Sequence, residues 1–179
     1  MIQRNLIEPV SLRVNPHHLW NQQWLLLTVG EFDQGDFNAM TVGWGSMGTM
    51  WGKPFVQIVV RPTRYTYHFL QRFADFTLCA FPEEKREALQ FLGTHSGRDG
   101  DKITESGLTP INSTRVKSPS YEEASLVLEC RKLYWNDMIS THFLDPEIET
   151  NYPGKDYHRI YFGEIVAAFG AKSFQEDQG

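Results

Sequence analysis

The chain has 179 residues and a mass of 20.7 kDa, which predicts a single domain over residues 1–179. Its net charge of −5, without any run of Lys or Arg, excludes the basic surface that nucleic-acid binders need. No stretch approaches the ~20 apolar residues of a membrane span, and residues 1–14 lack the apolar core of a signal peptide. We therefore expect a cytoplasmic protein with neither nucleic acid nor membrane as a partner.

The first half of the chain predicts an extension followed by strands. Residues 1–20 show no clear pattern and are expected to wrap over a neighbouring element or a second subunit. Apolar runs at residues 24–29 and 37–44 flank a polar turn, which indicates a β-hairpin or meander. Residues 55–60 form a β-branched run between two prolines, and residues 77–81 repeat the pattern. Both are typical of buried strands.

Two helices are predicted beside these buried strands. Aromatic residues recur at every fourth position over residues 65–73, and Thr63 stands where an N-cap is expected. A second helix should begin at Pro82, because Glu83 and Glu84 follow it in the first turn. Its apolar face ends at Gly93, which we expect to stop it.

The second half of the chain is less regular. Residues 108–111 suggest a short extended piece. Residues 125–135 fit either a helix or a strand, and their alternating apolar residues favour the strand. Residues 158–169 predict the last long strand, and the polar tail from residue 172 is expected to fray. The predicted fold is therefore mainly β with inserted helices, as a closed or split barrel.

Two short segments combine guanidinium groups with hydroxyls. Residues 61–66 (Arg-Pro-Thr-Arg-Tyr-Thr) lie where a strand should pass into a helix, so free backbone N–H groups would face an anion there. Residues 94–102 follow the second helix, and Ser96, Arg98 and Lys102 add donors and charge. The pair suggests a phosphate site. The alternative for the second segment is a solvated loop with internal ion pairs.

Residues 38–48 alternate small and large side chains along a strand that should then break into a Gly-rich turn. Glycine lets a flat ligand approach the backbone, and beside a phosphate site the ligand that fits best is flavin mononucleotide (FMN). The alternative is that Gly43, Gly45 and Gly48 accommodate only a bulge and a tight turn. The 13% aromatic content fits a stacking ligand, but a core or a dimer interface is the commoner place for any single ring.

No other catalytic apparatus is visible in the sequence. The six His residues have no paired metal-ligand spacing, and Cys79 and Cys130 belong to no Cys-x-x-Cys pair. A thiol within an apolar strand such as Cys79 is a poor nucleophile, and no Gly-x-Ser-x-Gly turn is present. We predict no metal site, so a cofactor must carry any reaction.

Four segments in this order resemble the flavin reductase-like family with an FMN-binding split β-barrel, in particular its flavoredoxin branch. They are residues 38–45 (Asn-Ala-Met-Thr-Val-Gly-Trp-Gly), 61–66, 96–99 and 156–165. The resemblance implies a Greek-key split barrel that forms a homodimer, with FMN near the subunit interface. It also implies these cofactor-binding residues: Asn38, Thr41, Val42, Gly43, Trp44, Gly45 and Ser46 along the ring, Arg61, Thr63, Arg64, Tyr65 and Thr66 at the phosphate and ribityl chain, and Ser96, Gly97, Arg98 and Lys102 on the far side.

The chain departs at the last strand from the family that it resembles. Related flavin reductases have an Asp-His pair there, whereas Tyr157 separates Asp156 from His158 here, so His158 is a catalytic candidate only for orienting a hydride donor or protonating reduced flavin. No Gly-x-Gly-x-x-Gly motif is present, so NAD(P)H would bind transiently over the flavin.

Three functions follow from this sequence. The first is an oxidoreductase that passes electrons from NAD(P)H through FMN to an unidentified redox partner or small acceptor. The second is an FMN electron carrier without a nicotinamide site of its own. The third is a split barrel that binds another phosphate ligand.

Overall fold

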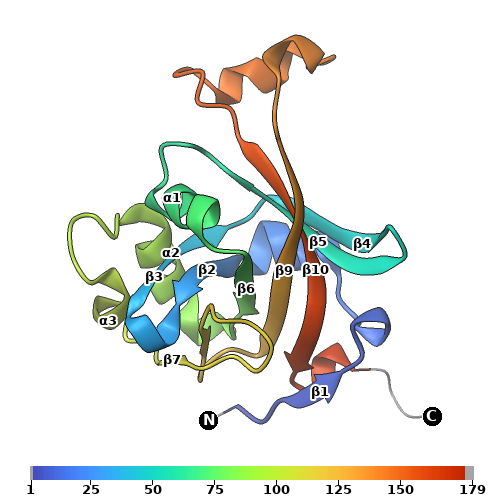
Figure 1. The fold of residues 1–179 in the computed structure, drawn as a ribbon, viewed down its shortest axis with the longest axis vertical. Helices are drawn as coiled ribbons and strands as arrows, with labels where there is room; N and C mark the ends of the chain where they lie inside the picture. The colour runs from blue at the N-terminus through green and yellow to red at the C-terminus, as the bar shows by residue number, and fades with distance from the viewer. Residues whose placement is uncertain (1, 176–179) are drawn as a thin grey trace.

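The computed structural model describes residues 2–175. Within that range an antiparallel sheet dominates, and α-helices cover part of it (Figure 1). The strands are β1 (Asn5–Ile7), β2 (Leu25–Glu31), β3 (Asp36–Val42), β4 (Gly45–Met50), β5 (Lys53–Val60), β6 (Asp75–Ala80), β7 (Pro110–Ile111), β8 (Ser120–Tyr121), β9 (Leu126–Asp137) and β10 (Arg159–Gly170), and the α-helices are α1 (Tyr65–Arg72), α2 (Arg86–Thr94) and α3 (Lys102–Glu105). None of the helices in this range is both long and apolar enough to cross a membrane.

The main sheet begins with β3 and ends with β4, two strands that follow each other in the sequence. Its order is β3-β2-β6-β9-β10-β5-β4, with β1 beside β10, and its pairings are antiparallel. Gly43 and Trp44 separate β3 from β4, yet no pairing joins these two strands in the described part of the chain. The sheet is a barrel with an open seam, and β3 keeps one unpaired edge there.

Strand β2 is buried on both of its faces. Leu25 and Leu27 point into the core inside the barrel, whereas Leu26 packs in a second core with Leu89 and Leu92 of α2. A strand buried on both faces needs no polar alternation, which explains its continuous apolar run. Helix α2 therefore covers the outer face of β2 and β3, whereas Phe69 and Leu70 of α1 belong to the core inside the barrel.

The strands predicted from apolar patterning are confirmed. Residues 24–29, 37–44, 55–60 and 77–81 correspond to β2, β3, β5 and β6, and the ambiguous segment at 125–135 is strand β9. The last predicted strand is β10, and the short extended piece is β7. The mainly β fold with inserted helices is thus confirmed.

Three local predictions were wrong. The segment after Trp44 is strand β4 rather than a Gly-rich turn, because Gly45 and its successors pair with β5. Helix α2 runs through Gly93 to Thr94, where Gly93 provides room for the neighbouring Thr41 side chain. Thr63 does not cap α1, since Arg64 holds the N-cap position without a side-chain cap bond.

Both ends of the described chain pack on the barrel. Strand β1 pairs with β10 of the same chain, and Trp20 is buried within the π-helical turn η2 (His18–Gln23). The polar tail was expected to fray, but the 3-10 turn η7 (Lys172–Phe174) packs against the core through Phe174. The rest of that predicted tail, residues 176–179, lies outside the described residues.

Strands β9 and β10 continue beyond the barrel and hold residues 138–158 between them. This segment, called the arm below, stands at the top of Figure 1 and contains the turns η5 (Ser140–His142) and η6 (Pro146–Asn151). The arm ends at His158, directly before β10, so it returns to the barrel beside the open seam.

Candidate functional site

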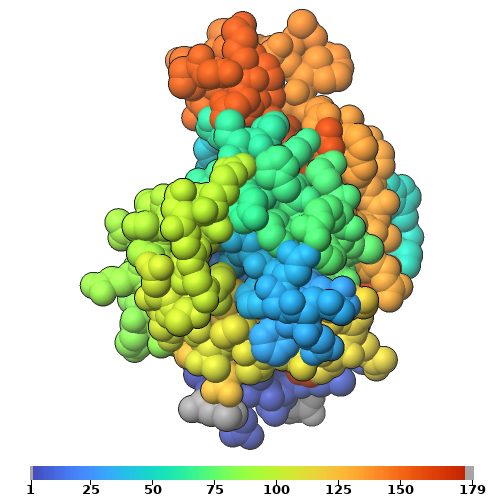
Figure 2. Space-filling view, turned by 60° about the vertical axis from the view of Figure 1, so that its left-hand side comes forward, coloured from blue at the N-terminus to red at the C-terminus, as the bar shows by residue number. Residues whose placement is uncertain are grey.

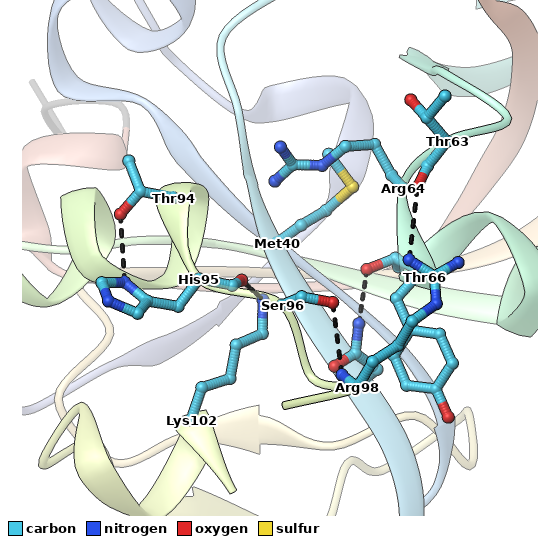
Figure 3. Close-up of a pocket in the computed structure, with 11 residues that line it drawn as sticks. Met40, Thr63, Arg64, Thr66, Thr94, His95, Ser96, Arg98 and Lys102 are labelled. Atoms are coloured by element: carbon cyan, nitrogen blue, oxygen red, sulfur yellow. Dashed lines mark hydrogen bonds between the residues drawn. The ribbon is translucent and has the colours of Figure 1, made fainter. Parts of the chain in front are cut away.

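A cavity of about 110 Å³ lies between β3, the start of α1 and the segment that joins α2 to α3 (Figure 3). In the space-filling view the yellow-green segment around residues 95–105 lies beside green α1 and the blue β2–β3 turn (Figure 2). The cavity thus collects side chains that are distant in sequence. Its lining residues are Asn38, Met40, Thr63, Arg64, Tyr65, Thr66, Thr94, His95, Ser96, Arg98 and Lys102.

The cavity lies where β5 gives way to α1. Strand β5 ends at Val60, and α1 begins at Tyr65, so the first turn of α1 leaves backbone N–H groups without helical partners. Those groups, together with the positive end of the helix dipole, favour an anion at this end of α1.

Arg64 and Arg98 bring guanidinium groups to the cavity from two segments. Nη2 of Arg64 donates to the Gly93 carbonyl at 2.6 Å, and burial, with repulsion from Arg61 as the smaller cause, lowers the Arg64 pKa. Arg98 lies over the ring of Tyr65, 4.9 Å from its centroid. Because none of the lining side chains is acidic, the cavity carries a net positive charge.

Lys102, the first residue of α3, closes one side of the cavity. Its side chain is buried, and Nζ donates to the carbonyls of Leu92 at 2.9 Å and His95 at 2.8 Å. Burial, and then repulsion from Arg64, lowers the pKa of the Lys102 amine to about 8. The protonated ammonium has three N–H donors, of which these two bonds use two, so one N–H remains for a bound anion.

A second group of contacts fixes the cavity wall. Nδ2 of buried Asn38 donates to Oγ1 of Thr66 at 2.7 Å, which joins β3 to α1. Gly97 lies so close that a Cβ there would come 2.2 Å from Oδ1 of Asn38. The backbone amide of Arg98 donates to Oγ of Ser96 at 3.2 Å, which shapes the turn that carries both residues.

The predicted ring-binding residues occupy different environments. Val42 is buried in the core, and the Thr41 hydroxyl donates to the Leu89 carbonyl, whereas Trp44 is half exposed. A Cβ at Gly45 would come 2.5 Å from the Trp20 ring, so this glycine makes room for Trp20 on its side-chain face. Ser46 donates to Oε1 of Gln57 at 3.0 Å, Gly43 faces Trp20 and Trp24, and Gly48 faces Phe55.

Arg61 does not line the cavity. Its Nη1 pairs with Oδ1 of Asp156 at 3.0 Å, its Nη2 donates to the Asn151 carbonyl at 2.7 Å, and the guanidinium lies over the Tyr152 ring. The hydroxyl of Thr63, which does line the cavity, also reaches Oδ2 of Asp156 at 3.4 Å. These contacts fasten the arm to the end of β5.

His158 lies near the open seam rather than in the cavity. Its ring centroid is 5.3 Å from that of Trp44, and the Tyr152 hydroxyl is 2.8 Å from its Nδ1. Burial, and then repulsion from Arg61, lowers the pKa of His158 to about 4, so the imidazole is neutral at physiological pH. A neutral imidazole beside an exposed Trp can orient a ligand, but it lacks the extra proton of an imidazolium that an acid would donate to reduced flavin.

Several residues of the site were absent from the predicted cofactor-binding residues, although Met40, Thr94 and His95 lie within the segments 38–45 and 94–102 that the sequence singled out. Met40, Thr94 and His95 line the cavity, and Tyr152 holds His158. Met40 was detectable, because it lies two positions from Asn38 on the same face of a strand. No signal in the sequence pointed to Tyr152.

A barrel with an open seam defines a split-barrel protein, and here a positively charged cavity lies beside the unpaired strand. The flavin reductase like domain matches residues 21–177, so the chain belongs to that family, as its segments predicted. The fold is similar to an FMN-binding domain of a flavin reductases-like enzyme from Shewanella baltica, with a TM-score of 0.69 and 16% identity over 94% of this chain and 78% of that one.

Two further solved structures share the fold. Flavoredoxin of Desulfovibrio vulgaris matches with a TM-score of 0.67 and 19% identity, over 90% of this chain and 76% of that one. An NADH:FAD oxidoreductase from Streptomyces globisporus matches with a TM-score of 0.64 and 18% identity, over 86% and 78% respectively.

Proposed function

We propose that the protein binds FMN and passes electrons from NAD(P)H through it to an unidentified acceptor. The observation that carries the proposal is the cavity lined by Arg64, Arg98 and Lys102 and by no acidic side chain, beside the unpaired edge of β3. The similar proteins include an FMN-binding domain and a flavoredoxin, which supports a flavin as the ligand.

In this proposal the cavity takes the phosphate and the open seam takes the ring. Arg64, Arg98 and Lys102 supply charge, the hydroxyls of Thr66 and Ser96 supply donors, and the volume of about 110 Å³ suits one phosphate group. The unpaired edge of β3 offers backbone N–H and C=O groups to the polar edge of a flat ring. Bound FMN supplies the redox chemistry, while these donors favour negative charge on the ligand.

Arg64→Ala tests the phosphate assignment. We expect it to weaken FMN binding by about 1.5–3 kcal/mol, as for the loss of a hydrogen bond to a charged group. Quenching of FMN fluorescence during titration measures the affinity. Arg72→Ala is the matched control, because Arg72 lies at the other end of α1 and pairs with Asp36. Equal affinities of the two variants would contradict the assignment, and a wild-type protein that leaves FMN fluorescence unchanged would favour another phosphate ligand.

Reduction by NAD(P)H separates a reductase from an electron carrier. Because His158 and Trp44 lie together at the open seam, we expect NADH or NADPH, added under anaerobic conditions, to bleach the absorbance of the bound flavin. Dithionite serves as the control that the flavin is reducible. A flavin that dithionite reduces and neither nicotinamide nucleotide reduces would favour the carrier.

We also propose that two copies associate, as the family resemblance implies. Large side chains remain exposed in three places: Leu144 on the arm, which is 98% exposed, Trp135 on β9, and Trp51 in the turn between β4 and β5. Exposed apolar groups of this size are typical of interaction surfaces. A second copy is the occupant that we propose for them.

A further inference from the structure

A cavity of about 550 Å³, called the basic groove below, lies at the C-terminal end of α1, and its lining residues differ from those of the cavity at the N-terminal end. Its charged lining consists of four basic and two acidic residues: Arg72, Arg115, Lys117 and Arg131, with Glu31 and Asp75. The basic groove therefore has a net positive charge, although the chain as a whole has a net charge of −5. A local excess of positive charge favours an anionic partner.

Two of the guanidinium groups in the basic groove are unpaired. Nζ of Lys117 pairs with Oε1 of Glu31 at 2.7 Å, and Arg72 pairs with an acid outside the groove. The side chains of Arg115 and Arg131 are exposed, and neither has a hydrogen bond, ion pair or ring contact to any group in residues 2–175. Each of them keeps a planar fork of N–H donors that matches a carboxylate.

A buried carboxylate fixes the loop that carries Arg115. Glu129 of β9 is 1% exposed, and its oxygens accept from the backbone amides of Thr114 at 2.8 Å and Arg115 at 2.6 Å. Arg131 follows Glu129 by two positions, so the two side chains lie on the same face of β9. One strand thus anchors the loop and supplies the second arginine. Both free guanidinium groups are held at one cavity before any partner binds, which lowers the entropy cost of binding.

The basic groove suits an acidic peptide segment better than a small anion. Its guanidinium groups are exposed, so a small anion would stay half in water, where a single ion pair contributes little. A peptide brings several carboxylates at once, and its apolar atoms can cover Phe73 and Val116, which are half-buried in the lining. Its backbone N–H groups also find acceptors in the carboxylates of Glu31 and Asp75, whereas a fully ionised phosphate has no donor for them.

From these observations we propose that the basic groove docks an acidic segment of a partner protein, whose carboxylates pair with Arg115 and Arg131. Clusters of arginine recognise acidic motifs in this way. Because the groove and the proposed phosphate site lie at opposite ends of α1, the partner and FMN can be bound together. The inference therefore goes beyond the proposed function and does not depend on it.

The test titrates a rhodamine-labelled peptide of sequence EELEELEE with the full chain and follows its fluorescence anisotropy, with and without FMN. We expect Arg115→Ala or Arg131→Ala to weaken peptide binding about 2- to 5-fold, and the double variant to weaken it about 5- to 30-fold, as for one and two exposed charge pairs. Both side chains are exposed, so the fold should persist, and the FMN affinity of the double variant should stay within about twofold of the wild-type value. Lys172→Ala, which removes an exposed positive charge outside the groove, is the matched control and should keep the wild-type peptide affinity.

Several results would overturn the inference. One is a wild-type chain that does not bind the peptide, and another is equal peptide affinity of the double variant and Lys172→Ala. Equal binding of a peptide with glutamine in place of every glutamate would mean that the carboxylates are not recognised. Displacement of the peptide by FMN would place it in the flavin cavity, and displacement by an equal concentration of inorganic phosphate would assign the groove to a small anion. A chain that binds the peptide and not FMN would instead refute the proposed function and leave this inference intact.

Discussion

Replacing Lys102 with Met is expected to weaken FMN binding by about 1.5–3 kcal/mol and to lower the free energy of unfolding by about 1–3 kcal/mol. The side chain is 4% exposed and holds the Leu92 and His95 carbonyls, which the thioether of Met cannot satisfy. The variant thus loses both the charge at the phosphate and two contacts of the wall. Fluorescence titration and urea unfolding measure the two effects, and Lys172→Met, on an exposed side chain, is the control.

The pH dependence of FMN affinity tests whether the charge on Lys102 is what strengthens FMN binding. Burial lowers its pKa to about 8 in the free protein, and a phosphate dianion beside the amine should raise that pKa again. The complex then binds more protons than the free protein above about pH 8, so the affinity should fall as pH rises through that value. Lys102→Met should lack this fall. The same loss of affinity above pH 8 in the variant would show that another group causes it.

The stability of the free protein should change in the opposite direction. The pKa of Lys102 is lower in the folded chain than in the unfolded chain, whose amine has the ordinary value of 10.5. Between about pH 8 and 10.5 the unfolded chain therefore binds more protons, and this residue makes the folded state more stable as pH rises. Together the two trends separate ligand binding from folding.

Most strands were predictable because burial requires apolar residues at particular positions along a strand, and those positions can be seen in the sequence. Strand β5 is apolar at nearly every position because both of its faces are covered, whereas β4 reads Gly-Ser-Met-Gly-Thr-Met and has no such pattern. The pairing of β4 with β5 makes it a strand regardless of propensity. The same tertiary effect carries α2 through Gly93, where Thr41 packs against the helix.

The candidate site was predictable as segments and not as contacts. Local residue types were enough to mark 61–66 and 94–102 as candidate anion-binding segments, and the fold brings Arg64, Arg98 and Lys102 to one cavity. Whether a given arginine faces that cavity depends on partners far away in the chain. Arg61 turns instead to Asp156, which follows it by 95 residues.

Gly97→Ala should have the other large effect on FMN binding, because it disturbs the wall without removing any charge. A Cβ at this position would lie 2.2 Å from Oδ1 of Asn38 and 3.2 Å from Cδ1 of Tyr65. Asn38 cannot yield easily, since it is buried and its Nδ2 donates to Thr66. Either that bond breaks or the segment carrying Arg98 moves outward, and we expect a loss of about 1–3 kcal/mol in FMN affinity for such overpacking.

A double-mutant cycle separates the clash from any general damage to the loop. Asn38→Ala alone should weaken binding by losing the bond to Thr66, but in the Gly97→Ala background it should cost nothing further, because the clash is gone. Gly100→Ala is the matched control in the same loop, where an added Cβ meets only the carboxylate end of Glu105 at 3.3 Å. Additive losses for Gly97→Ala and Asn38→Ala would mean that the two residues act independently. The close approach of residue 97 to β3 would then not be what shapes the phosphate cavity.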